Sequence, residues 1–191
     1  IFLTGLYGAL NFYSFGQEAM VLQLSSHTRV VLDYDQILKL LTVPRLIKYG
    51  KELSQDLPPD ITFGKLTTDN VELLDSKWPH RYPTSSWYFE LLIRTNNGYG
   101  LYLNNSLISW VLINEAGTLS HMYTMEEGRQ KGYAEVLLKL VCNIELEAGR
   151  HVSAFCVKGN VNACKLYRKL GFQQCEGVAW CYLKNKKKSR L

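Results

Sequence analysis

Several features that define other protein classes are missing from this chain of 191 residues. Its five cysteines are odd in number and contain no Cys-x-x-Cys pair, so we expect no disulfide framework and a reducing compartment, the cytoplasm or a mitochondrion. The four histidines share no ligand spacing, so no metal cofactor is expected. The apolar residues 1–15 are too short and too interrupted to span a membrane, and no basic segment precedes them as in a signal peptide.

Common phosphate-binding motifs are missing as well. No Gly-Lys-Ser/Thr follows a glycine-rich loop, and no Gly-x-Gly-x-x-Gly occurs, so neither a P-loop nor a dinucleotide fold is indicated. The net charge of +5 lies mostly in the basic C-terminal tail, which we interpret as a solvated end, so no nucleic-acid partner is expected. The first residue is isoleucine, and we therefore expect a piece of a longer protein.

Hydrophobic residues make up 47% of the chain, which is enough for a real core. The Leu-Pro-Pro-Asp run at 57–60 is the best boundary signal, so we expect an N-terminal segment, 1–60, and a main domain, 61–191. In the N-terminal segment we expect strands at 19–24 and 29–34, a helix at 36–41 and a helix from Pro44 to residue 53.

After residue 60, periodicity and turn residues predict an alternation of strands and helices. We expect strands at 61–66, 100–103, 107–114, 119–124, 151–157 and 172–183, and helices ending near 77 and 93 or spanning 130–148 and 161–170. This order predicts an α+β fold, a mixed sheet with helices on both faces.

The stretch 119–142 organises the chain, because a strand there leads through a charged, glycine-containing turn into an amphipathic helix. The first amides of a helix have no internal partner and carry partial positive charge, which suits a phosphate. The turn has the spacing Arg129-x-x-Gly132-x-Ala134, in which Gly132 lets the backbone approach a ligand closely. This motif alone is weak, because ordinary turns between a strand and a helix match it by chance.

A second motif lies downstream, Asn160-Val-Asn-Ala-Cys-Lys-Leu-Tyr167-Arg-Lys-Leu-Gly-Phe172. It resembles the N-x-x-A-x-x-L-Y-x-K-x-G-F signature of the GCN5-related N-acetyltransferase (GNAT) superfamily, and the turn at Arg129 resembles that superfamily's pyrophosphate loop. Residues 109–112 and 123–124 are most similar to the glycine N-acyltransferase-like, FR47-like branch. The resemblance implies a mostly antiparallel sheet that is splayed at a bulged strand, and it suggests that 1–60 is a remnant of a degenerate GNAT-like half.

The resemblance also implies a site for acetyl-CoA or another acyl-CoA. Backbone groups of the strand ending at Thr124 would pair with the pantetheine arm and polarise the thioester carbonyl, and the amides after Arg129 would hold the pyrophosphate. The implied acyl-CoA contacts are Met122, Tyr123, Thr124, Arg129, Gln130, Lys131, Gly132, Tyr133, Ala134, Asn160 and Tyr167. Asn160 is equally well interpreted as a helix N-cap, and the two roles are compatible.

Three residues are predicted to be catalytic: Tyr167, Thr124 and His121. Tyr167 resembles the general acid that donates a proton to the leaving thiolate, with a buried core tyrosine as the alternative. The family's acidic residue aligns with Thr118, which cannot act as a base at neutral pH. His121 is the nearest titratable side chain, followed by the two glutamates at 126 and 127, although a packed histidine is at least as good an interpretation.

These residues predict an acyl-CoA-dependent N-acyltransferase that transfers the acyl group directly to a primary amine, with an amino acid such as glycine as a candidate acceptor. Two alternatives remain open at this point. One is a protein N-acetyltransferase that acts on an N-terminus or a lysine. The other is a non-catalytic CoA-binding regulatory module, which the missing acid at Thr118 would favour.

Overall fold

The computed structural model describes residues 32–43, 57–157 and 159–183, and these contain seven strands in one sheet with the order β2-β3-β4-β5-β6-β1-β7. The elements are β1 (Leu32–Val43), β2 (Ile61–Lys65), α1 (Val71–Lys77), α2 (Ser86–Arg94), β3 (Gly98–Leu103), β4 (Ser106–Ile113), β5 (Leu119–Thr124), α3 (Tyr133–Glu147), β6 (Val152–Val157), α4 (Val161–Lys169) and β7 (Gln173–Leu183). From residue 61 onward this order confirms the predicted α+β fold.

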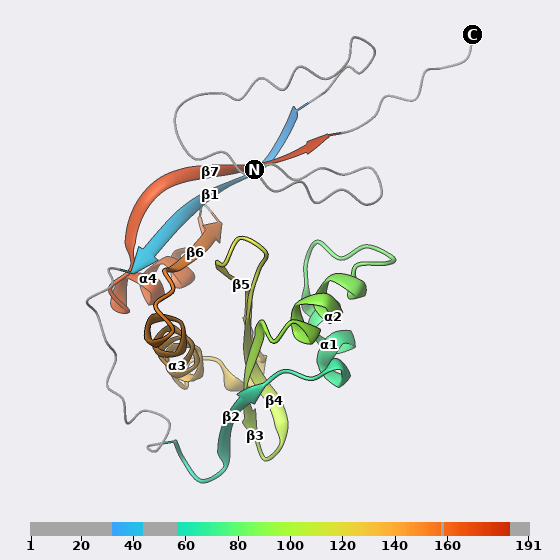
Figure 1. Ribbon diagram of the computed structural model, residues 1–191, viewed down its shortest axis with the longest axis vertical. Coiled ribbons are helices and arrows are strands. Elements are labelled where there is room, and N and C mark those ends of the chain that lie inside the picture. The colour runs from blue at the N-terminus through green and yellow to red at the C-terminus, as the bar shows by residue number, and fades with distance from the viewer. Residues whose placement is uncertain (1–31, 44–56, 158, 184–191) are drawn as a thin grey trace.

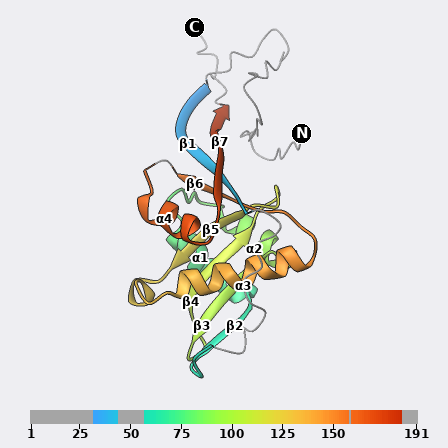
Figure 2. The same cartoon turned by 90° about the vertical axis from the view of Figure 1, so that its left-hand side faces the viewer.

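Helices cover both faces of the sheet (Figures 1 and 2). On one face α3 and α4 pack through residues such as Leu137, Val141 and Leu170, each at most 2% exposed. On the other face α1 and α2 bury Leu74 and Phe89. Full burial of a side chain of this size stabilises the fold by about 1.5–3 kcal/mol, so the two layers fix the helices against the sheet. None of the helices among the described residues is both long and apolar enough to cross a bilayer.

The helix predicted at 36–41 is wrong. These residues lie in β1, which is antiparallel to β6 on one side, with Leu38 opposite Val157, and to β7 on the other. Six residues make a marginal helix, whereas a place between two strands satisfies the backbone of β1 on both edges. Tertiary pairing therefore overrides the local helical pattern.

The position of β1 also bears on the expected N-terminal segment. Residues 32–43 belong to the same sheet as the main domain and lie between two of its strands (Figure 1). The strand expected at 19–24 and the helix expected at 44–53 lie outside the described residues. The domain boundary at residue 60 remains a prediction. The origin of residues 1–60 as a degenerate GNAT-like half also remains a prediction.

The sheet opens between β5 and β6, and this opening confirms the predicted splay. Their parallel pairing is confined to Leu119 and Ala154, whereas β5 and β4 pair along most of their length. Opposite the step from Trp110 to Leu112 in β4, β5 runs from Tyr123 to Ser120 and so contains one extra residue. That bulge includes His121, whose φ of 49° is left-handed, and a bulge of this kind bends the strand that contains it.

Candidate active site

The turn between β5 and α3 is built for close approach of a ligand. After the short 3₁₀ turn Glu126–Gly128, Arg129 is extended, Gln130 has a φ of 61° and Gly132 has a φ of 84°. These left-handed residues delay α3 to Tyr133, so the start predicted at residue 130 is three residues early. A Cβ at Gly132 would meet nothing within 4 Å, so the space above this residue is open.

Five consecutive backbone amides, those of residues 130–134, belong to this turn and the start of α3. In the part of the chain that the structure describes they donate to no backbone acceptor, and the next two amides, of Glu135 and Val136, both donate to the Gly132 carbonyl, at 3.0 and 3.1 Å. Amides at the N-terminus of a helix that have no partner form a binding site for an anion. The residues present therefore fit a pyrophosphate.

Arg129 connects this turn to β5. Its Nε donates to the carbonyl of Thr124 at 3.2 Å, its Nη2 donates to the hydroxyl of Tyr123 at 3.1 Å, and Nη1 lies 3.8 Å from Glu126. Its side chain is half exposed. The guanidinium is thus held against the end of β5 and remains reachable for an anion from solvent.

The end of β5 is fixed by β4. The Ser109 hydroxyl donates to the carbonyl of Tyr123 at 3.1 Å and lies 2.8 Å from the Thr124 hydroxyl, and the rings of Trp110 and Tyr123 stack 5.0 Å apart. Met122 is half-buried and lines the pocket described below. This end of β5 lies beyond the Leu119–Ala154 pair with β6, and its contact with pantetheine remains a prediction.

Asn160 caps α4. Its side-chain oxygen accepts the amide of Ala163 at 3.1 Å, so the N-cap interpretation is confirmed. Its predicted contact with pantetheine remains a prediction that this cap permits, because the residue is exposed between β6 and α4.

Tyr167 lies in the core, 4% exposed, with its ring 5.0 Å from that of Phe172. Burial, with the nearby thiols of Cys156, Cys142 and Cys164, raises the pKa of Tyr167. The phenol therefore stays protonated at neutral pH and can donate to a thiolate only when one forms beside it. Its role as general acid remains a prediction.

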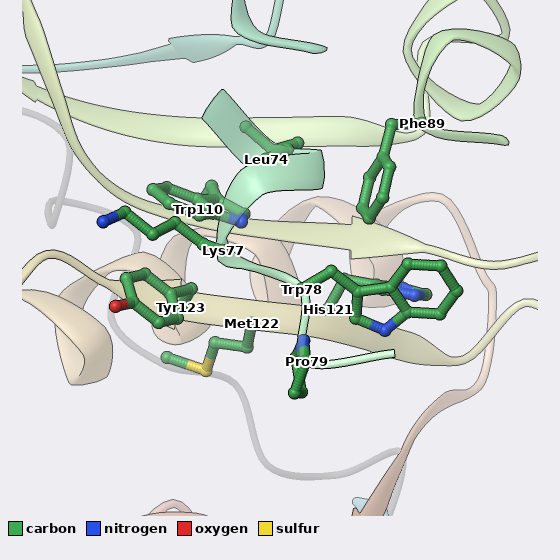
Figure 3. A pocket seen from close by; sticks show the side chains of 9 residues that line it. All are labelled: Leu74, Lys77, Trp78, Pro79, Phe89, Trp110, His121, Met122 and Tyr123. Atoms are coloured by element: carbon green, nitrogen blue, oxygen red, sulfur yellow. The ribbon is translucent and has the colours of Figure 1, made fainter. Parts of the chain in front are cut away.

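A pocket opens next to β5 on the face of the sheet that α1 and α2 cover (Figure 3). The pocket is small and partly open to solvent, and its volume is about 290 Å³ only when the adjoining solvent space is counted. Most of its lining is apolar or aromatic, with one lysine, and the lining residues are Leu74, Lys77, Trp78, Pro79, Phe89, Trp110, His121, Met122 and Tyr123. Sequence reasoning named only the three β5 residues among these. The aromatic residues in the loop after α1 were the available signal for Trp78.

His121 is packed among rings. Its imidazole lies 5.5 Å from Trp78, 5.6 Å from Tyr88 and 5.2 Å from Phe89, and its Nδ1 is 3.0 Å from the Ser120 hydroxyl. Burial lowers the pKa of His121 to about 4, against a smaller opposing effect of Glu115. The imidazole is therefore neutral at pH 7 and a weak base, which favours the packed interpretation. A role as base remains a prediction.

Thr118 and the two glutamates at 126 and 127 differ in their surroundings. Thr118 is buried, and its hydroxyl and amide both donate to the side-chain oxygen of Asn114, at 2.8 and 3.0 Å, so this residue closes the turn between β4 and β5. Glu126 pairs with Arg129, and Glu127 is exposed on the same turn. Among the described residues no group of three or more histidine, cysteine or acidic side chains could hold a metal ion.

Comparison with solved structures identifies proteins of similar fold. A Drosophila protein aligns with a TM-score of 0.68 at 17% identity over 82% of this chain and 52% of its own. A GCN5-related N-acetyltransferase from Sphaerobacter thermophilus aligns with a TM-score of 0.62 at 14% identity over 81% of this chain and 53% of its own. Naa50 of Arabidopsis thaliana, in complex with the bisubstrate analogue CoA-Ac-MVNAL, aligns with a TM-score of 0.52 at 15% identity over 64% of this chain and 97% of its own. The fold is that of the GNAT acetyltransferases.

One family model matches part of the sequence. Residues 98–181 match the model of the family described as FR47-like protein, so this part of the chain is similar to that family. It contains both motifs from which the resemblance was read. No curated protein matched the sequence. The chain spans about half the length of the Drosophila and Sphaerobacter proteins.

Proposed function

We propose that the protein is an acyl-CoA-dependent N-acyltransferase, which transfers an acetyl or other acyl group directly to a primary amine. The observation that carries the proposal is the row of five amides at 130–134, which has no backbone acceptor among the described residues and lies beside Arg129. A row of N–H groups that follows an arginine in the chain suits an anion such as a pyrophosphate.

The opening between β5 and β6 supports the same assignment. An extended pantetheine arm can add to the edge of β5 as another strand would, because β5 and β6 pair only at Leu119 and Ala154. The arm would then pass from the amides at the start of α3 to the region between Thr124 and Tyr167. A backbone N–H of β5 would polarise the thioester carbonyl at the point where negative charge develops.

Transfer then needs an amine and a proton donor. The nitrogen attacks the thioester carbon, the C–N bond forms and the C–S bond breaks. We assign Tyr167 as the group that protonates the departing sulfur. The attacking nitrogen loses its proton to water or to a weak base. His121 is the titratable residue on β5 that could receive this proton, although its low pKa makes it a weak base.

The pocket under α1 and α2 supports an acceptor that has an apolar side chain next to its amine. Trp78, Phe89 and Trp110 line it on one side of β5, and Lys77 supplies a cation that suits a carboxylate. Glycine, the candidate from the sequence resemblance, would leave this apolar lining unfilled. An apolar amino acid is therefore our first candidate.

A peptide N-terminus with an apolar first residue is the second candidate. The observation in its favour is that the pocket is open to solvent, so a chain could continue outward from a first side chain held inside it. The likeness to Naa50 concerns the fold and leaves this choice to experiment.

Product analysis tests the function. Purified protein would be incubated with acetyl-CoA and, separately, glycine, phenylalanine, phenethylamine or a peptide that begins with methionine, and N-acetylated product would be measured by mass spectrometry. We expect phenylalanine to exceed glycine, with Trp78→Ala raising the KM for phenylalanine and leaving the KM for acetyl-CoA unchanged. CoA binding without product from any amine would instead favour the non-catalytic regulatory module.

A further inference from the structure

A pair of cysteines lies where β6 meets α4. The sulfur of Cys156, on β6, is 3.3 Å from the sulfur of Cys164, in the first turn of α4. Both are thiols in the structure. Because a sulfur–sulfur contact this short requires both side chains to point toward each other, the directional condition for a disulfide is already met.

We propose that Cys156 and Cys164 are a redox modification site, a dithiol that is reversibly oxidised to an intramolecular disulfide. A disulfide bond is about 2.05 Å long, so the two sulfurs must approach each other by only a little more than 1 Å. Side-chain rotation and a small shift of the first turn of α4 can supply that distance. The inference does not depend on acyl transfer.

Exposure sets the order of the two chemical steps. Cys156 is 2% exposed, whereas Cys164 is half-buried, so an oxidant from solvent meets Cys164 first. With a low-molecular-weight disulfide as oxidant, the Cys164 thiolate attacks one of its sulfurs, forms a mixed disulfide and releases the first thiol. Cys156 then loses its proton, attacks the Cys164 sulfur and releases the second thiol. Two electrons pass from the protein to the oxidant, and the two protons end on the two released thiols.

Cys142 is a third cysteine of the same domain, and we expect it to be unreactive. It is fully buried on α3, and burial, with a smaller contribution from Glu145, raises its pKa to about 12. A thiol in that state is a poor nucleophile and is not in contact with an oxidant in solvent. The proposed reactivity therefore belongs to the pair and not to buried cysteines of this fold in general.

The disulfide would close a ring around the turn between β6 and α4, which contains Asn160. At present Cys156 and Cys164 both contact this turn, because the Asn160 carbonyl accepts the Cys164 amide at 3.0 Å and lies 3.8 Å from the Cys156 sulfur. A covalent bond across a short loop mainly restricts the unfolded chain. Oxidation should therefore raise the melting temperature, and reduction should restore it.

Peptide mapping tests the proposal on the whole chain. The reduced protein would be incubated with oxidised glutathione, its remaining thiols blocked, and the product digested with trypsin without reduction. Trypsin cleaves after Lys158 in the sequence, so Cys156 and Cys164 fall in different peptides, 151–158 and 159–165, while Cys142 falls in 140–150 and the other two cysteines share 170–184. We expect an intact mass lower by two hydrogen atoms and a linked pair of 151–158 with 159–165, both reversed by dithiothreitol.

Variants separate the possible outcomes. Cys164→Ser should abolish the linked pair, and Cys142→Ala should retain it. Stable glutathionylation of Cys164 without transfer to Cys156 would overturn the proposal, as would a linkage of either cysteine to a different partner. Recovery of both cysteines as thiols, under conditions that oxidise a dithiol control peptide, would overturn it as well.

Discussion

The side chain of Arg129 folds back onto the end of β5, where its Nε donates to the carbonyl oxygen of Thr124 at 3.2 Å. The same guanidinium reaches the Tyr123 hydroxyl. Arg129 thereby joins the two parts of the proposed acyl-CoA site, the strand that would pair with pantetheine and the turn that would hold the pyrophosphate. Its hydrogen bonds orient the charged group before any ligand arrives.

Replacement of Arg129 by glutamine should weaken acetyl-CoA binding by about 10- to 100-fold, because a charge-assisted hydrogen bond is worth about 1.5–3 kcal/mol. Isothermal titration calorimetry gives the dissociation constant. Arg94→Gln is the matched control, since Arg94 is an exposed arginine on α2 paired with Glu90. Equal affinities for the two variants would mean that the pyrophosphate does not lie at this turn.

Gly132→Asp should abolish measurable CoA binding, because the carboxylate would occupy the open space above the amides and repel phosphate. The left-handed φ of Gly132 adds a strain of about 1 kcal/mol for any other residue. Gly117→Asp is the control for this strain, since Gly117 has a φ of 71° and equally open surroundings in the turn after β4. Both variants should lose similar thermal stability, and Gly117→Asp alone should keep CoA affinity, as measured by calorimetry.

Tyr167→Phe should lower kcat by about 10²- to 10⁴-fold, because it removes a proton donor and leaves the buried ring in place. CoA affinity should change little. Tyr99→Phe is the control, because it removes another buried phenol, on β3. If steady-state rates show Tyr167→Phe to be as active as Tyr99→Phe while chemistry limits turnover, Tyr167 is a core residue and not the general acid.

His121 should make stability depend on pH. Its pKa is about 4 in the folded protein and about 6.5 when unfolded, so between these values the unfolded chain binds the additional proton. Stability from this group is complete above pH 6.5 and is lost as the pH falls toward 4, by up to about 3 kcal/mol. Urea unfolding of the wild type and of His121→Phe across this window should show the steeper loss in the wild type. Parallel curves would contradict the burial of a neutral imidazole.

Sequence patterns predicted the strands and helices after residue 60 because each combines clear periodicity with good turn chemistry. Asn96 and Gly117, for example, have the left-handed φ values that their turns require. The start of β1 falls in the strand expected at 29–34, but its continuation could not be predicted, because the apolar run at 36–41 suits a short helix or a strand equally. Its state depends on β6 and β7, which lie more than 100 residues away in sequence.

Some features of the candidate site could likewise be predicted from the sequence, and others could not. The turn at Gly132 and the cap at Asn160 are local motifs, so sequence alone located both. The pocket is assembled from separate elements, and Trp78 and Phe89 acquire a shared role only when the helices pack on β5. The low pKa of His121 has the same origin, because its cause is burial among rings from other elements. Single-residue chemistry cannot reveal such an environment.

Acetyl-CoA binding to the wild-type chain is the measurement that tests the central claim most directly. A ligand that binds only the folded state at 100 times its dissociation constant stabilises that state by about 2.7 kcal/mol. For a chain of this size the melting temperature should rise by roughly 5–10 °C. Differential scanning calorimetry of protein freed of bound CoA should show that rise, with a one-site binding isotherm at 25 °C. An unchanged melting temperature and no heat of binding at millimolar acetyl-CoA would contradict the acyl-CoA site.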